Sequence, residues 1–178
     1  TLLIILILPL RYLVVERLRE NPIVYLRSFQ YADAPLVLGR IVLPPAIGLA
    51  PLLAVTHELQ PPDEIYSQVQ VGRYVPSLYS VSNQEWQNWI KECFSRASAV
   101  IIDCSVGSQG VMWELDLANQ MLPRERIIVM QGKKSGSDSE LDLPSVNYEL
   151  GFWKERRARR DLKRCLKRAF ASLYRQSS

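Results

Sequence analysis

Two short, almost wholly apolar runs constrain the fold of this chain more than any other feature. The first is Ala99-Val-Ile-Ile-Asp-Cys104, and the second is Arg126-Ile-Ile-Val-Met130. Strands of a parallel sheet have this composition because helices cover both faces of the sheet and leave no polar side. Both runs therefore predict central strands of an α/β sheet.

Helical patterns lie on both sides of the first apolar run. An apolar stripe from Trp86 to Phe94 predicts an amphipathic helix, and Ser82 and Glu85 are spaced as a capping box before it. After the run, a loop of small residues leads into residues 111–121, which read as a second helix. The alternation of strand and helix favours a parallel sheet.

Further strands are expected at residues 23–28 and 51–56, which are rich in apolar and β-branched side chains. Pro44-Pro45 is expected to cut short any helix between them. Residues 60–80, which contain several prolines, are expected to form an irregular excursion over a sheet edge. The predicted fold is α/β, a doubly wound, flavodoxin-like parallel sheet of about four to five strands with helices on both faces.

Several kinds of site are disfavoured by the residues present. His57 is the only histidine, and it sits in a strand-like run without an obvious partner, so a Ser-His-Asp or Cys-His mechanism is not expected. The three cysteines are widely spaced and match no metal-ligand pattern, so buried free thiols and no metal site are predicted. The chain has no P-loop and no Gly-x-Gly-x-x-Gly motif for phosphate binding.

The first 20 residues open with an apolar stretch that ends at Arg11. This stretch is about half of the roughly 20 residues that a membrane-spanning helix needs. Arg11, Arg17 and Arg19 follow, and such residues mark the cytoplasmic side of a span. Residues 1–20 are therefore interpreted as the end of a transmembrane or juxtamembrane helix, with the domain membrane-associated on the cytoplasmic side. The alternative is a buried first strand or helix of the domain.

The C-terminal region, residues 152–178, is strongly basic. It holds ten Lys or Arg and two Asp or Glu, against 12 and 16 in residues 1–151. Apolar residues recur at helical spacing from Ala158 to Leu173, so an amphipathic helix is predicted over residues 154–175. Its apolar stripe would pack on the domain, and its basic face would either be solvated or meet anionic lipid headgroups. Because the charge is confined to this tail, no nucleic-acid partner is expected.

Polar residues gather where the predicted strands end. In open α/β sheets ligands bind outside the carboxyl ends of the strands. One candidate site residue is Glu114, on the helix that follows the central strand. The candidate substrate-binding residues, taken from the first strand end, the central strand end and that helix, are Arg27, Ser28, Phe29, Asp33, Asp103, Ser105 and Trp113.

One stretch resembles a known family. Residues 89–118, WIKECFSRASAVIIDCSVGSQGVMWELDLA, resemble the middle of TIR (Toll-like) domains, and Tyr25-Leu-Arg-Ser-Phe29 resembles their opening motif. The resemblance covers about two-thirds of the chain, is most specific at Gly110–Leu115, and points to bacterial, membrane-anchored TIR-like domains. It departs from the family at Trp113, which directly precedes Glu114, whereas TIR helices usually place this Trp four residues earlier.

The resemblance implies an activity. In catalytic TIR domains, and in the related nucleoside-deoxyribosyltransferase-like folds, the Glu of this helix acts at the ribose of a nucleotide. It implies that residues 21–151 form a TIR-like domain that cleaves the N-glycosidic bond of NAD or a related nucleotide through Glu114, with no cofactor required. Arg27 would then pair with the phosphates, while Ser28, Phe29 and Trp113 would hold the ribose and base.

Other interpretations remain open at this point. A glutamate in the first turns of a helix is also favoured by the helix dipole alone. Many TIR-like domains are non-catalytic signalling modules that act by self-association, and a homo-oligomer at the membrane is expected under either interpretation. A third class of function is a sensor that binds a nucleotide without cleaving it.

Overall fold

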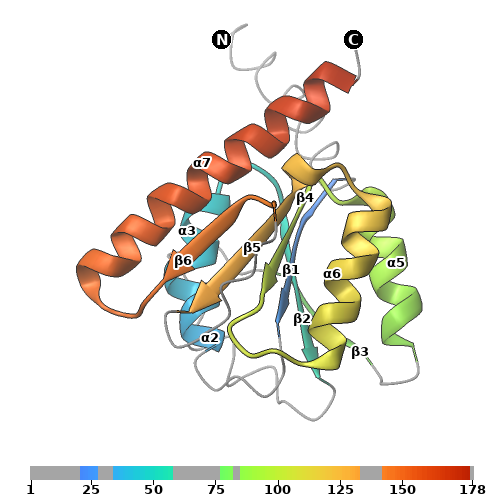
Figure 1. The fold of residues 1–178 in the computed structure, drawn as a ribbon, viewed down its shortest axis with the longest axis horizontal. Helices are drawn as coiled ribbons and strands as arrows, with labels where there is room; N and C mark the ends of the chain where they lie inside the picture. The colour runs from blue at the N-terminus through green and yellow to red at the C-terminus, as the bar shows by residue number, and fades with distance from the viewer. Residues whose placement is uncertain (1–20, 28–33, 58–76, 82–84, 133–141, 177–178) are drawn as a thin grey trace, which may run out of the picture.

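The fold is a six-stranded, wholly parallel sheet with helices on both faces (Figure 1). The computed structural model describes residues 21–27, 34–57, 77–81, 85–132 and 142–176. The strands, in chain order, are β1 (Ile23–Arg27), β2 (Leu52–His57), β3 (Ser77–Val81), β4 (Ala99–Asp103), β5 (Ile127–Gly132) and β6 (Ser145–Tyr148). The expected doubly wound α/β class is confirmed.

The strand order places a switch point at the centre of the sheet. The order is β3-β2-β1-β4-β5-β6, so the chain winds outward from β1 in one direction and from β4 in the other. Five of the strands, β2-β1-β4-β5-β6, have the flavodoxin-like order, and β3 extends the sheet beyond β2 to give the Rossmann order. At the switch point β1 and β4 are paired, and Arg27 lies opposite Asp103.

The sheet has more strands than the four to five expected. The two that the sequence patterns did not reveal are its edge strands. β3 occupies the end of the stretch that was expected to be irregular, and β6 is only four residues long with alternating exposure. Both strands are short, and β6 alternates between exposed and buried residues, so neither forms an apolar run.

One face of the sheet is covered by α2 (Ala34–Val37), η1 (Leu38–Val42), α3 (Leu43–Ala46) and α7 (Phe152–Gln176). The helical path from residue 34 ends at Ala46, directly after Pro44-Pro45, as expected from these prolines. The turn before the prolines widens into a π-helix, and the prolines occupy the start of α3.

The other face is covered by α5 (Trp86–Arg96) and α6 (Gln109–Met121), while η2 (Arg124–Arg126) leads into β5. Ser108 caps α6, and its hydroxyl accepts a hydrogen bond from the Val111 N–H at 3.2 Å. The α5 helix begins at Trp86 after Glu85, later than a capping box at Ser82–Glu85 requires, and Glu85 makes no side-chain cap. Ser82 itself lies outside the described residues.

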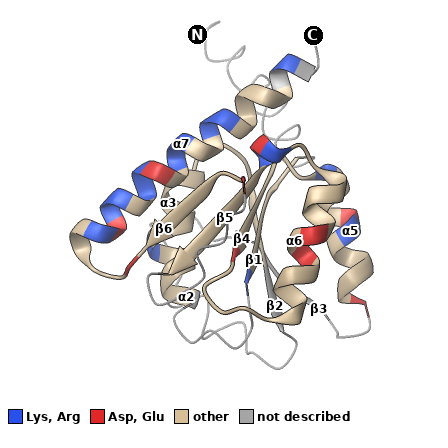
Figure 2. Cartoon of the chain, viewed as in Figure 1, with Lys and Arg blue, Asp and Glu red and all other residues tan. Residues whose placement is uncertain are grey.

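The long C-terminal helix α7 buries one stripe and exposes the rest. Ala158, Leu162, Leu166 and Ala169 are almost fully buried against the sheet, and each buried Leu contributes about 1.5–3 kcal/mol through apolar burial. Lys and Arg residues recur along the rest of the helix, as the blue segments of Figure 2 show. Residues 1–20 lie outside the described part of the chain, and within that part no helix has the length and apolarity to cross a membrane.

Candidate functional site

Asp103 lies at the carboxyl end of β4, where strand order reverses, and is 2% exposed. Its Oδ1 accepts hydrogen bonds from both the backbone N–H and the hydroxyl of Ser105. Its Oδ2 accepts from the hydroxyls of Tyr148, at 2.9 Å, and Tyr25, at 3.2 Å. Burial raises the pKa of Asp103, and these hydrogen bonds oppose the rise. The carboxyl group is therefore held by four protein donors.

Ser105 extends this network to the neighbouring strands. Its hydroxyl oxygen lies 2.7 Å from the Tyr148 hydroxyl and accepts a hydrogen bond from the Gly132 N–H at 2.7 Å. A Cβ on Gly132 would lie 3.1 Å from the Ser105 hydroxyl oxygen, so a side chain there would crowd the network. The side chains of Tyr25, Asp103, Ser105 and Tyr148 thus connect the carboxyl ends of β1, β4 and β6, and Gly132 adds β5.

Arg27 lies at the end of β1, beside Asp103 in the sheet register. It is 5% exposed, and burial lowers the pKa of its guanidinium, while Tyr25 and Asp103 act in the opposite direction. A buried cation next to a buried acid is stabilised by that acid. The structure therefore brings Arg27, Asp103 and Ser105 together at the switch point, and their role in substrate binding stays a prediction.

Glu114 lies on the opposite side of the sheet, in the second turn of α6. It is 6% exposed, and its Oε2 has no hydrogen-bond partner among the described residues. Its neighbours on α6, Val111, Leu115 and Ala118, belong to the apolar core. Burial in this setting raises the pKa of Glu114 to about 8. An unpaired buried carboxyl group is costly in a folded protein, which singles it out as a functional candidate.

Cys104 lies near both carboxyl groups, those of Asp103 and Glu114. Burial raises the pKa of its thiol to about 12, and the nearby Asp103 and Glu114 act in the same direction. Both acids are therefore close enough to Cys104 to influence its ionisation. With so high a pKa the thiol is protonated at neutral pH and is a poor nucleophile.

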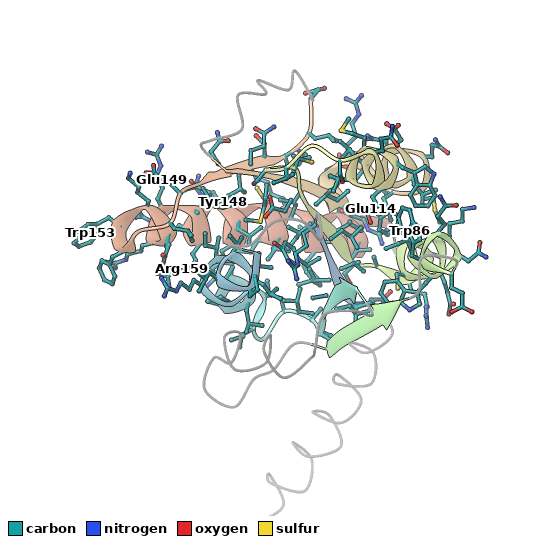
Figure 3. The ribbon with its side chains drawn as sticks, turned by 90° about the horizontal axis from the view of Figure 1, so that it is seen from below. Trp86, Glu114, Tyr148, Glu149, Trp153 and Arg159 are labelled. Atoms are coloured by element: carbon teal, nitrogen blue, oxygen red, sulfur yellow. The ribbon has the colours of Figure 1, made fainter. Side chains whose placement is uncertain are left out.

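Two tryptophans pack together beside Glu114. The rings of Trp113 and Trp86 have centroids 4.8 Å apart in an edge-to-face arrangement, which joins α6 to the start of α5. Both side chains are half-buried and contact the apolar core. Figure 3, viewed toward the carboxyl ends of the strands, places Glu114 and Trp86 on the α5–α6 side of the sheet and Tyr148 on the α7 side.

The predicted site residues thus form two groups on the two faces of the sheet. Arg27, Asp103 and Ser105 are in one group, and Trp113 and Glu114 are in the other. Ser28, Phe29 and Asp33 lie outside the described residues. The sequence interpretation missed Tyr25, Gly132 and Tyr148. Only Tyr25 had a visible signal, because its polar hydroxyl interrupts an apolar strand.

No metal centre is formed by the residues that the structure describes, because no three His, Cys, Asp or Glu side chains there are grouped as a site would require. Comparison with protein families, with curated proteins and with solved structures found no match to this chain. The resemblance to TIR domains therefore remains a prediction from the sequence.

Proposed function

We propose that this protein cleaves the N-glycosidic bond of NAD or a related nucleotide, with Glu114 as the catalytic carboxylate. The observation that carries the proposal is the Glu114 carboxyl group, which is buried and whose Oε2 is without a hydrogen-bond partner in the described chain. A buried carboxyl group that only stabilised the fold would be paired, because an unpaired one costs stability.

The chemistry suits a site with one carboxylate. Breaking the bond between ribose C1′ and the nicotinamide nitrogen sends the bonding electron pair to nicotinamide, which leaves as a neutral molecule. Positive charge then develops on the ribose, and an adjacent carboxylate stabilises it. A water molecule adds to C1′ and releases a proton, giving ADP-ribose. The reaction consumes only water, so no cofactor is required.

The raised pKa of Glu114 fits a cationic substrate. Below a pH of about 8 the free protein holds this side chain mainly protonated. A positively charged nicotinamide ribosyl group placed beside it would favour the ionised form. Substrate binding and release of the Glu114 proton would therefore be coupled, and the carboxylate would form when its counter-charge arrives.

We assign the binding of the rest of the nucleotide to the switch point. Arg27 lies at the carboxyl end of β1, the edge of an open α/β sheet where ligands bind. Its guanidinium could pair with a phosphate. Asp103 and Ser105 would act by holding β1, β4, β5 and β6 in register beneath that surface, since their hydrogen-bonding groups already have protein partners.

The experiment is nicotinamide release from NAD by the 178-residue chain at high protein concentration. Glu114→Gln keeps the size of the side chain and removes its charge, and Asp116→Asn is the matched control, because Asp116 is exposed on the same helix. Release by the parent and by Asp116→Asn, with none by folded Glu114→Gln, would support the proposal. Equal release by all three would assign the reaction to another residue, and no release by the parent would contradict the activity.

We also propose that the protein works at the cytoplasmic face of a membrane. In support, Arg156, Arg160, Lys163 and Lys167 recur at spacings of four, three and four residues along the exposed side of α7. Basic residues near an anionic surface each contribute about 1 kcal/mol. Flotation with phosphatidylserine vesicles tests this. The parent should float, and Lys163→Glu/Lys167→Glu should float less.

A further inference from the structure

A polar groove lies beside β6, the last strand of the sheet, on the side of the molecule away from Glu114. The cavity there has a volume of about 880 Å³, with residues 145–149 and the end of β5, Gln131 and Gly132, on one side and α7 on the other. α7 contributes a basic stripe formed by Lys154, Arg157, Arg164 and Arg168. This basic stripe is distinct from the row of basic residues on the exposed side of α7, which is formed by Arg156, Arg160, Lys163 and Lys167.

Among the described residues that line the groove, basic side chains outnumber acidic ones. Arg157 and Arg164 share one carboxylate, Asp161, at 4.0 Å and 3.2 Å. Lys154 pairs with Glu149. Arg168 also lines the groove and has no carboxylate partner among the described residues. In the described lining two acids therefore face four basic side chains, so the groove favours an anionic occupant.

The opposite wall offers backbone hydrogen bonds. The Val129 N–H donates to the Pro144 carbonyl at 2.9 Å, so the backbone at residue 144 faces β5. Because successive residues of a strand turn their N–H and C=O groups to opposite sides, those of Ser145 and Asn147 face away from β5. In the described chain no strand pairs with this outer edge of β6. Such an edge can accept an added strand.

The length of the groove fits an extended peptide better than a small anion. From Lys154 to Arg168 the helix advances by about 21 Å, which is the length of about six residues in a β-strand. A single phosphate would contact one or two of these side chains and none of the strand edge. A peptide would use both walls, with its backbone on β6 and its acidic side chains on α7.

We propose that an acidic, extended segment of a partner protein docks in this groove by adding a strand to β6, with its carboxylates paired to the basic stripe of α7. The strand edge gives affinity and fixes the direction of the segment, and Arg157, Arg164 and Arg168 select acidic side chains. This docking site lies on the α7 side of the sheet and does not depend on the reaction proposed for Glu114.

The probe is a fluorescein-labelled ten-residue peptide in which Glu and Val alternate, titrated with the 178-residue chain and followed by fluorescence anisotropy. Arg164→Glu/Arg168→Glu should weaken binding about tenfold or more, since two charge pairs become repulsive. The matched control is Lys163→Glu/Lys167→Glu, which makes the same charge change on the outward side of α7 and should leave binding within about twofold.

A second variant tests the strand edge without changing charge. Asn147→Pro removes an N–H that faces away from β5, and proline is tolerated at such edge positions. It should weaken peptide binding about fivefold or more while the circular dichroism spectrum and the unfolding midpoint stay near those of the parent. A peptide methylated at alternate backbone nitrogens should bind the parent weakly for the same reason.

Four outcomes would overturn the proposal. The first is that the parent does not bind the peptide, and the second is that the two charge-reversal variants lose equal affinity. The third is that folded Asn147→Pro binds the peptide as well as the parent does. The fourth is that the parent binds phosphatidylserine vesicles and not the peptide, and that this vesicle binding depends on Arg164 and Arg168. The last outcome would assign the groove to lipid headgroups.

Discussion

The hydroxyl of Tyr148 donates a hydrogen bond to Oδ2 of Asp103 at 2.9 Å and so connects edge strand β6 to central strand β4 across β5. Both side chains are buried, with 3% and 2% of their surfaces exposed. A strand of only four residues has few backbone hydrogen bonds of its own, so this contact has a large share in holding β6 in place.

Replacing Tyr148 by Phe should therefore destabilise the fold. The change removes one donor from a buried carboxyl group and leaves the ring in place, which should cost about 1–3 kcal/mol. Urea unfolding followed by circular dichroism measures the loss. Asn147→Ala is the control, because the Asn147 side chain is exposed on the same strand and its loss should change stability by less than about 0.5 kcal/mol. Equal stability of Tyr148→Phe and the parent would show that the hydrogen bond contributes nothing.

Gly132 should tolerate no side chain. A Cβ there would lie 3.1 Å from the hydroxyl oxygen of Ser105 and 3.3 Å from its Cβ, closer than ordinary van der Waals contact. Gly132→Ala is expected to cost about 1–3 kcal/mol, as overpacking of a well-packed site does. Gly107→Ala is the control, because a Cβ at that position meets no atom within 4 Å.

A double variant separates crowding from loss of backbone freedom at Gly132. Adding Ser105→Ala removes the hydroxyl that the new methyl group would crowd. If crowding is the cause, Gly132→Ala should cost less in the Ser105→Ala background than in the parent, by about 0.5 kcal/mol or more. Additive effects would contradict this explanation.

The central strands and the covering helices were predictable from the sequence because each carries a repeated pattern. β4 and β5 are apolar runs, and the stripe from Ala158 to Ala169 has helical spacing. β6 has a buried-to-exposed alternation only two cycles long, which is too short to separate it from a loop. The edge of the sheet was therefore the least predictable part of the fold.

The candidate site was predictable only in part, for a different reason. Strand ends can be placed from the sequence, so Arg27 and Asp103 were expected near one another, and the register pairs them. Besides the neighbouring Ser105, the side chains that engage Asp103 come from Tyr25 and Tyr148, which are 78 and 45 positions away in the chain. No local pattern reveals such contacts. That Glu114 lies on the opposite face from Asp103 likewise depends on how α6 crosses the sheet.

The burial of Glu114 predicts a pH-dependent stability. The pKa rises from 4.5 in the unfolded chain to about 8 in the folded protein, so the folded state binds more protons between these values. Stability contributed by the protonated group is fully present below pH 4.5 and is lost as the pH rises toward 8. At pH 7 the loss amounts to roughly 3 kcal/mol.

Glu114→Gln should remove this dependence, because the amide does not titrate. The variant and the parent should have similar unfolding free energies near pH 4.5, and the variant should become increasingly more stable by comparison up to pH 8. Asp116→Asn, which removes an exposed charge from the same helix, should follow the parent. Chemical denaturation at several pH values measures all three. Parallel curves for Glu114→Gln and the parent would mean that Glu114 is not buried as a protonated acid.

The same pKa predicts the pH profile of the proposed reaction. If the ionised form of Glu114 stabilises the ribosyl cation, kcat/KM for NAD should rise about tenfold per pH unit below 8 and level off above it, because kcat/KM reports the free protein. For kcat the rise should occur at lower pH, since the bound cation favours the carboxylate. Nicotinamide release between pH 6 and 9.5, corrected for spontaneous hydrolysis of NAD, measures how kcat/KM and kcat each depend on pH. A kcat/KM that instead falls above pH 8 would make Glu114 the general acid of the reaction, and a flat profile would remove it from the chemistry.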